Sequence, residues 1–282
     1  MKEKILYVTD LDGTLLRNDA TVSDFTANTI RHLTERGMLF SYATARSYTT
    51  AKKVTENLPD KLPVIVFNGS FIVETGTGKH LLSNIFQKEE VREILDFLTE
   101  NRLYPLVNAF LDGKEKFSYV KGSETSGVKR FTENRKNDIR RNPVPHISEL
   151  YAGEVFHITC IDEEKNLIPA YERFREFYPC VLYRDTYSKD IWFEIHPKGA
   201  TKATAVLALK EMLHCKSVVC FGDGKNDIPM FNAADFCYAV SNAEDELKAI
   251  ATGIIESNEN DGVAKWLAAN AEVDFCQKQL SK

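Results

Sequence analysis

Short apolar runs alternate with amphipathic segments in the first part of the chain. Residues 4–9 (KILYVT), 39–44 (LFSYAT) and 64–67 (VIVF) are β-rich apolar runs with the length of a buried strand. Residues 25–36 and 47–58, which lie between these runs, have helical character. Strand and helix alternating in this order are typical of a parallel α/β sheet that is covered on both faces.

The pattern changes after this segment and resumes near the last third of the chain. Residues 71–83 resemble a hairpin, residues 88–103 form an amphipathic helical pattern, and residues 104–150 are polar and irregular. A strand over 154–162, a helix and an antiparallel strand pair over 181–197 follow. After residue 197, predicted helices and strands alternate again.

These changes predict an α/β protein of two domains, which suits a chain of 282 residues. The predicted core combines residues 1–82 with residues 188–282 and is built on a parallel sheet. Residues 83–187 form the predicted second domain, of α+β type, inserted between the two core segments.

The composition changes this picture little. Hydrophobic residues make up 43% of the chain and charged residues 27%, as in soluble globular proteins, and the net charge of −5 predicts neither nucleic acid nor membrane as partner. The N-terminal residues lack the apolar stretch of a signal peptide, so a cytoplasmic location is expected. The six cysteines show no metal-binding spacing and are expected to be buried free thiols. The sequence does not distinguish a monomer from a homodimer.

The first apolar run ends in DLDGT, which places Asp10 and Asp12 two residues apart. Two like charges about 4 Å apart repel each other by roughly 4 kcal/mol at an effective dielectric near 20, so a divalent cation is a natural partner for them. Ligands of open α/β sheets bind outside the carboxyl ends of the strands, where Asp10 lies. Gly13 permits a tight turn there, and Thr14 adds a hydroxyl and an amide.

A second acidic cluster follows another predicted strand. In VVCFGDGKNDIPM (218–230), the strand leads into Asp223, Asn226 and Asp227. Oxygen ligands of this kind suit Mg²⁺, whereas no spacing of cysteine and histidine supports a zinc site. His146, His157 and His196 also lack ligand spacing and are expected to be structural. The cofactor predicted from these carboxylates is therefore Mg²⁺.

Three further polar groups are expected at the same edge of the sheet. Thr44 follows one predicted strand, and Asn68 with Gly69 follows the next. Lys202 precedes an apolar helix, and its position is preferred over that of Lys198. Carboxylates, a lysine, hydroxyl and amide donors and Mg²⁺ together suit phosphoryl transfer, because transferring phosphoryl oxygens need positive charge and N–H donors.

Four segments in this order, DLDGT, YATAR, GATKATAV and GDGKNDIPM, resemble the motifs of haloacid dehalogenase (HAD) superfamily phosphatases. The segment FNGS, the large insertion and the late stretch SNAEDELKAIATGIIESNENDGVAKWL resemble the Cof-type branch of that superfamily. The resemblance implies a Rossmann-like HAD core with an inserted C2-type cap. It also implies a Mg²⁺-dependent phosphatase that acts on a small phosphorylated metabolite, most often a sugar phosphate.

The resemblance also implies a role for each matching residue. Asp10 would be the nucleophile, forming an aspartyl-phosphate, and Asp12 the general acid/base; Thr44 and Lys202 would hold the phosphoryl group. The metal ligands would be Asp10, Asp12 through its carbonyl, Asp223 and Asp227. The remaining predicted phosphate- and substrate-binding residues are Leu11, Gly13, Thr14, Ala45, Arg46, Asn68, Gly69 and Asn226.

Some alternatives stay open at this point. Arg46 is either a substrate contact or a member of a surface ion pair. Ala45 stands where the motif usually has glycine, and Ser241 replaces another usual glycine at a place expected to be remote from the chemistry. The basic run 129–141 is expected to be a solvated face and not a polyanion site, since acidic residues interrupt it. The same motifs also resemble phosphomannomutases, and a non-catalytic phosphoryl or ligand sensor is a further alternative.

Overall fold

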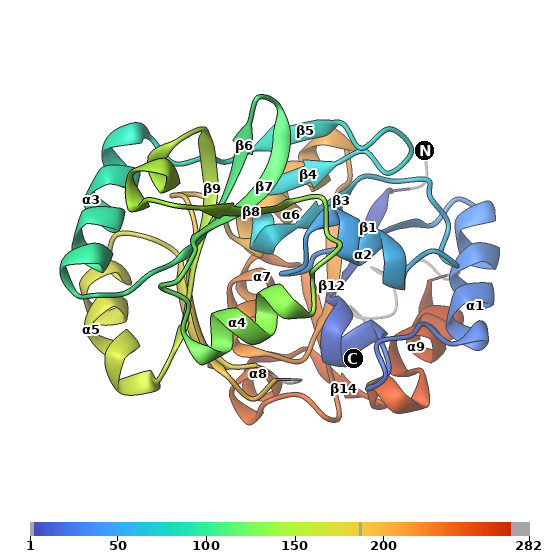
Figure 1. Cartoon of the computed structure of the whole chain (residues 1–282). Helices are drawn as coiled ribbons and strands as arrows, with labels where there is room; N and C mark the ends of the chain where they lie inside the picture. The colour runs from blue at the N-terminus through green and yellow to red at the C-terminus, as the bar shows by residue number, and fades with distance from the viewer. Residues whose placement is uncertain (1–2, 186–187, 272–282) are drawn as a thin grey trace. The chain divides into compact units, whose positions relative to one another are not determined.

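The computed structural model describes residues 3–185 and 188–271. The chain folds into two compact units, the first made of residues 1–83 and 201–282 and the second of residues 84–200 (Figure 1). The boundary predicted at residue 188 differs from the observed one at residue 201. The reason is that residues 191–195 form a strand that pairs on both sides with strands of the second unit.

The first unit contains a parallel sheet of five strands in the order β14-β13-β12-β1-β2. Strand β12 is buried along its whole length and β1 at every residue except Ile5, which explains their apolar sequence. This sheet confirms the predicted α/β fold class. The strands are β1 (Ile5–Thr9), β2 (Leu39–Tyr42), β12 (Ser217–Gly222), β13 (Phe236–Val240) and β14 (Gly253–Ile255).

Within the described part of the first unit, six α-helices accompany this sheet. In Figure 1, α1 and α9 lie together on one side of the sheet and α6 and α7 on the other. Helix α1 begins after Ser23, whose side chain accepts a hydrogen bond from the amide of Thr26 and so caps the first turn. The helices are α1 (Asp24–Glu35), α2 (Tyr48–Val54), α6 (Lys202–Met212), α7 (Ile228–Ala233), α8 (Asp245–Ile250) and α9 (Gly262–Asn270).

The sequence predicts that the apolar run at residues 64–67 extends the parallel sheet, but the structure shows a different pairing. It forms β3 (Val64–Val66), which pairs antiparallel with β4 (Phe71–Val73), and β4 pairs with β5 (His80–Ser83). An isolated parallel bridge between Ala43 and Ile65 links this small sheet to the segment that follows β2. The chain turns back at Asn68 and Gly69, which both have positive φ, and this tight turn favours the antiparallel partner.

The second unit is a six-stranded sheet in the order β10-β11-β9-β6-β7-β8, antiparallel except for the β7–β8 pair. Helices α3 and α5 pack on one face against residues such as Ile158 and Phe193, whereas α4 packs on the other face near Ile161 (Figure 1). The strands are β6 (Leu106–Leu111), β7 (Lys114–Val120), β8 (Arg141–Val144), β9 (Glu154–Asp162), β10 (Cys180–Arg184) and β11 (Ile191–Ile195), and the helices are α3 (Lys88–Glu100), α4 (Ser126–Glu133) and α5 (Glu164–Phe174).

Residues 104–150 are regular in structure, which corrects the irregular pattern expected from the sequence. Strands β6 and β7 form a hairpin through Asp112 and Gly113, both with positive φ. A two-residue Asp-Gly loop of this type matches the twist of antiparallel strands and is a sequence signal for a hairpin. The charged residues of β7 conceal the alternation that would otherwise have predicted this strand.

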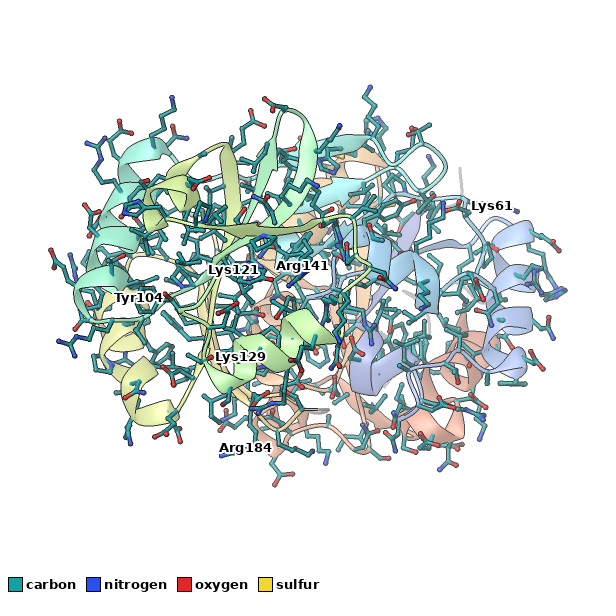
Figure 2. All side chains as sticks on the ribbon, in the orientation of Figure 1. Lys61, Tyr104, Lys121, Lys129, Arg141 and Arg184 are labelled. Carbon is teal, nitrogen blue, oxygen red and sulfur yellow. The ribbon has the colours of Figure 1, made fainter. Side chains whose placement is uncertain are left out.

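The basic run 129–141 lies on α4, the following turn and β8. Its Arg130 pairs with Asp190, and Arg140 pairs with both Glu115 and Asp138. Figure 2 shows Lys129 and Arg141 of the same run on α4 and β8. Several of the charges are therefore neutralised within the unit, and the expected solvated face stays a prediction.

The five described cysteines are free thiols, as predicted, and three of them are buried, whereas Cys180 and Cys215 are half-buried; Cys276 lies outside the described residues. Within residues 3–185 and 188–271, none of the helices combines the length and the apolar character of a transmembrane span.

Candidate active site

The carboxyl ends of β1 and β12 lie side by side and carry the two acidic clusters. Strand β1 runs parallel to β12 in register, with Thr9 opposite Phe221. Asp10 follows β1 directly, and its amide donates a hydrogen bond to the carbonyl of Phe221 (2.9 Å). Asp223 follows the last residue of β12. Because both strands point the same way, the two clusters meet at one edge of the sheet.

Three carboxylates and one ammonium group form the centre of this site. Ligand oxygens of Asp10, Asp223 and Asp227 lie within 4.8 Å of one another. The Nζ atom of Lys202 lies 2.5 Å from Oδ1 of Asp10 and 2.7 Å from Oδ1 of Asp227. Asp10, Asp227 and Lys202 are all buried, so the lysine charge offsets only part of the negative charge in a poorly solvated place.

The pKa values in this group reflect burial and mutual repulsion. Burial raises the pKa of Asp10 well above its usual value, and only the nearby Lys202 ammonium opposes that increase among the larger effects. Burial, followed by the charge of Asp227, raises the pKa of Asp223 to about 7. Burial disfavours the charged form of Lys202, but Asp10 and Asp227 outweigh it, so the pKa of Lys202 is raised.

These residues fit a hard divalent cation. The donors are carboxylate oxygens, and a bound cation would relieve the repulsion among them. Asp10 and Asp223 both offer carboxylate oxygens to such a cation. Asp227 accepts hydrogen bonds from Lys202 and from the amides of Asp223 and Gly224, so the lysine and backbone already engage its oxygens.

The turn after β1 brings Gly13 and Thr14 against Asp223. Gly13 has φ +78°, and a Cβ atom at that position would lie 2.2 Å from Oδ2 of Asp223. The hydroxyl of Thr14 donates a hydrogen bond to Oδ1 of the same carboxylate (2.9 Å). Glycine is therefore required at residue 13 both by the backbone conformation and by the approach of Asp223.

Asp12 lies outside the group of three carboxylates. Its carboxylate accepts two hydrogen bonds from Arg46, from Nε to Oδ2 (2.7 Å) and from Nη2 to Oδ1 (2.5 Å). Both side chains are partly exposed. The structure thus places Arg46 on the predicted acid/base residue, and the predicted contact between the carbonyl of Asp12 and the metal stays a prediction.

The loops after β2 and β3 are tied together near the same edge. The amide of Asn68 donates to the carbonyl of Thr44 (2.9 Å), and the amide of Arg46 donates to the Thr44 hydroxyl (3.1 Å). Gly69, with φ +102°, approaches the carbonyl of Thr201 so closely that a Cβ atom would lie 2.1 Å from it. Thr201 caps helix α6, so this contact joins the loop to the helix that carries Lys202.

The remaining predicted residues are distributed around these groups. Leu11 is buried and Ala45 is exposed, while Asn226 is half-buried in the short turn before α7. Nothing observed tests their predicted role in phosphate or substrate binding.

A family model for haloacid dehalogenase-like hydrolases matches residues 7–267, which include every residue of this site. The chain belongs to this family. The match confirms the resemblance noted from the motifs, the α/β fold with a second sheet-and-helix region, and the predicted enzyme class, a hydrolase of phosphoric monoesters.

Known members of the hydrolase family align over almost the whole chain. The 5-amino-6-(5-phospho-D-ribitylamino)uracil phosphatase YwtE of Bacillus subtilis (strain 168) is 27% identical over 92% of this chain and 95% of its own. The crystal structure of TM0651 from Thermotoga maritima has 22% identity and a TM-score of 0.76, covering 95% of this chain and 97% of its own. The HAD subclass IIB sugar phosphatase BT4131 has 20% identity and a TM-score of 0.73, covering 96% and 100%.

One residue of this hydrolase's candidate site, Asn242, was not predicted from the sequence. Asn242, next to the Ser241 that was expected to be remote from the chemistry, donates a hydrogen bond from Nδ2 to the carbonyl of Gly13 (2.8 Å). Its Oδ1 accepts from the amide of Asn258, whose Nδ2 in turn donates to the carbonyl of Leu16 (2.9 Å). Two asparagines thus hold the turn between the catalytic candidates. The signal in the sequence is a polar residue just after β13, another strand end at this edge.

Proposed function

We propose that this enzyme hydrolyses small phosphomonoesters, such as sugar or polyol phosphates, through an aspartyl-phosphate on Asp10 and with Mg²⁺ as cofactor. The observation that carries the proposal is the buried Lys202 ammonium between Asp10 and Asp227, with Asp223 beside them. The 27% identical relative is named for a phosphate ester of a ribityl chain, which supports a polyol phosphate as substrate class.

Asp10 is the proposed nucleophile because its carboxylate directly follows strand β1 and contacts Lys202. One of its oxygens attacks phosphorus and the bond between phosphorus and the ester oxygen breaks. Lys202 offsets negative charge where the phosphoryl oxygens accumulate it, and the Thr44 hydroxyl adds a donor. When bound, Mg²⁺ supplies further positive charge that stabilises the phosphoryl oxygens.

Asp12 completes the proposed cycle as general acid and then general base. It gives its proton to the departing alkoxide and next removes a proton from the water that attacks the aspartyl-phosphate, which releases phosphate and restores Asp10. Arg46 binds both carboxylate oxygens of Asp12 in the structure. This ion pair has to open for Asp12 to reach the leaving oxygen. We therefore propose that Arg46 positions Asp12 between turnovers.

A phosphate-release screen tests this function. Sugar, polyol and ribityl phosphates are incubated with the enzyme in Mg²⁺ and then in excess chelator. We expect Mg²⁺-dependent release of free phosphate that Asp10→Asn abolishes and Asp12→Asn strongly reduces. Isomerised sugar phosphate without free phosphate would point to the mutase alternative, and Mg²⁺ binding without turnover would point to a sensor. The cytoplasmic location and the absence of nucleic acid and membrane partners stay predictions.

A further inference from the structure

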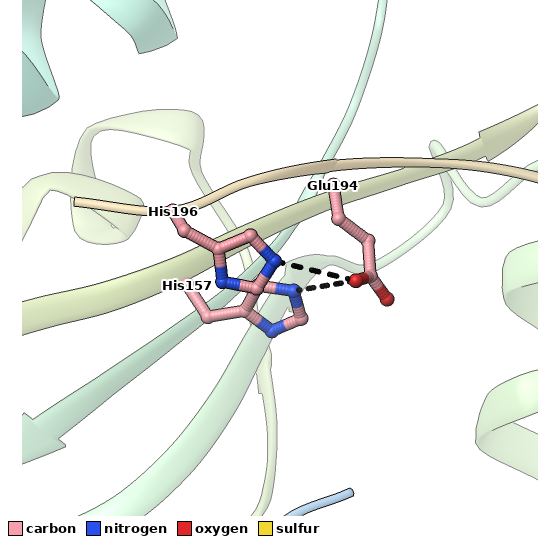
Figure 3. A group of neighbouring side chains, drawn as sticks. All are labelled: His157, Glu194 and His196. Carbon is pink, nitrogen blue, oxygen red and sulfur yellow. Dashed lines mark ion pairs between the residues drawn. The ribbon is translucent and has the colours of Figure 1, made fainter. Parts of the chain in front are cut away.

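A second cluster of possible metal ligands lies within the second unit. His157 belongs to β9, Glu194 to β11, and His196 follows β11 by one residue. In Figure 3 the two imidazole rings lie one above the other, and both direct Nε2 toward the same carboxylate oxygen. Oε2 of Glu194 is 3.6 Å from Nε2 of His157 and 3.4 Å from Nε2 of His196. All three side chains are buried.

Strand register explains why these residues converge. In the antiparallel pair of β9 and β11, Thr159 lies opposite Glu194. Because side chains alternate along a strand, His157 and Thr159 share a face, and Glu194 and His196 share the same one. Ile158 and Phe193, their neighbours in sequence, point to the opposite face and join the core under α3 and α5.

A buried carboxylate of this kind is stabilised by hydrogen-bond donors and by positive charge. Positive charge here would come from a proton on an imidazole or from a bound cation. The two rings are stacked with centroids 4.7 Å apart and an angle of 17°, so protonating both would place two cations in contact. A single proton would make one of the two imidazoles cationic and leave the other neutral beside the carboxylate.

The distances fit a shared ion. Both nitrogen–oxygen separations exceed the usual length of a charge-assisted hydrogen bond, about 2.7–2.9 Å. Two ligands bound at about 2.0–2.2 Å to one tetrahedral ion lie roughly 3.4 Å apart, close to the observed values. Ion binding would turn the rings out of their stack, because each nitrogen lone pair lies in the plane of its ring.

Neighbouring polar groups can support the ligands. The hydroxyl of Tyr183 donates to Oε1 of Glu194 (3.1 Å), which leaves Oε2 facing the histidines. Nδ2 of Asn108 lies 3.2 Å from Nδ1 of His157, and the Thr159 hydroxyl lies 3.2 Å from Nε2 of the same ring. If the amide is turned so that its oxygen faces the ring, Nδ1–H would donate to it, which is the usual second contact of a metal-bound histidine, and a metal at Nε2 would replace the contact with the Thr159 hydroxyl.

We propose that His157, Glu194 and His196 bind one Zn²⁺ ion within the second unit. Two imidazoles and one carboxylate suit Zn²⁺, whereas the oxygen-only group around Asp10 and Asp223 suits Mg²⁺. The site joins β9 to the end of β11. It goes beyond the proposed phosphatase function and does not depend on it.

Metal binding to the whole protein tests the proposal directly. Chelator-treated protein with the Asp223→Asn substitution, which weakens the oxygen-only group, is titrated with Zn²⁺ in millimolar Mg²⁺ by calorimetry. We expect one Zn²⁺ per chain. His157→Asn and His196→Asn should each weaken binding by about 100-fold or more, since each removes one of three ligands. His146→Asn, in the same unit but outside the cluster, is the matched control and should leave the affinity unchanged.

A Co²⁺ spectrum keeps the test valid where a histidine variant fails to fold. Co²⁺ bound to the protein with Asp223→Asn alone should show the intense visible bands of a four-coordinate site with nitrogen ligands, and Zn²⁺ should abolish them. Circular dichroism shows which variants are folded. No Zn²⁺ bound in Mg²⁺, or binding that survives in folded His157→Asn and His196→Asn proteins, would overturn the assignment in favour of a shared proton.

Discussion

Replacing Lys202 by methionine removes the one ammonium group that contacts both Asp10 and Asp227. The lysine is 2% exposed, and its Nζ lies 2.5 Å and 2.7 Å from the two carboxylates. Taking one partner from a buried ion pair leaves an uncompensated buried charge, which costs about 3–5 kcal/mol. A domain of ordinary stability, about 5–15 kcal/mol, stays folded after such a loss.

Urea unfolding in the presence of chelator measures the stability, and phosphate release in Mg²⁺ measures the activity. We expect Lys202→Met to lower the free energy of unfolding by about 3–5 kcal/mol and kcat by at least about 100-fold. Lys210→Met is the matched control on the same helix, because Lys210 pairs with Asp235 at the surface. An exposed pair of this kind contributes less than about 1 kcal/mol.

The double variant Lys202→Met/Asp227→Asn separates stability from catalysis. Neutralising Asp227 removes one of the unpaired buried charges, so the double variant should regain about 1–3 kcal/mol relative to Lys202→Met. Its activity should stay low, since the lysine charge beside Asp10 is still absent. The reasoning is refuted if Lys202→Met is as stable as Lys210→Met, or if the double variant regains turnover.

Three further substitutions test other parts of the first unit. Gly13→Ala introduces a Cβ atom 2.2 Å from Asp223 at φ +78°, so Mg²⁺-dependent phosphate release should be lost; release within about twofold of the parent protein would contradict this. Asn242→Ala removes the hydrogen bond to the carbonyl of Gly13, and we expect kcat to fall about tenfold or more with little change in KM. An unchanged kcat would show that the turn keeps its conformation without this hydrogen bond. Burial raises the pKa of Tyr42 from 10.0 to about 12, so its contribution to stability is complete below pH 10 and is lost as the pH rises toward 12. Urea unfolding against pH should show a steeper decline over this range in the parent protein than in Tyr42→Phe, and equal slopes would contradict the expectation.

Local patterns in the sequence were sufficient to predict which edge of the sheet in the first unit carries the candidate active site. Apolar runs marked the strands, and polar residues at their ends marked where side chains collect, because parallel strands that are neighbours end at the same edge. This reasoning placed Asp10 and Asp223 together, and the structure brings their carboxylates within 4.8 Å of each other, with Asp227 beside them. The motif order then predicted the family, which the match over residues 7–267 confirms.

Other features depended on pairings that no local pattern contains. Strand β11 reads as the start of the core in sequence, but its hydrogen bonds to β9 and β10 place it in the second unit. The Arg46–Asp12 ion pair and the Asn242–Gly13 hydrogen bond join loops that follow different strands. Which side chain of a loop reaches which neighbour depends on turn geometry, and residue type alone does not predict it.

Spacing along the chain predicts a ligand cluster only where the ligands share one loop or helix. His157 and His196 have no such spacing, and they meet at Glu194 because an antiparallel register aligns two strands that are distant in sequence. The order of apolar and polar residues thus determines which segments become strands and which edge collects carboxylates. The hydrogen-bonded register between strands decides which distant side chains become neighbours, because a shift of one residue would turn every one of them to the other face.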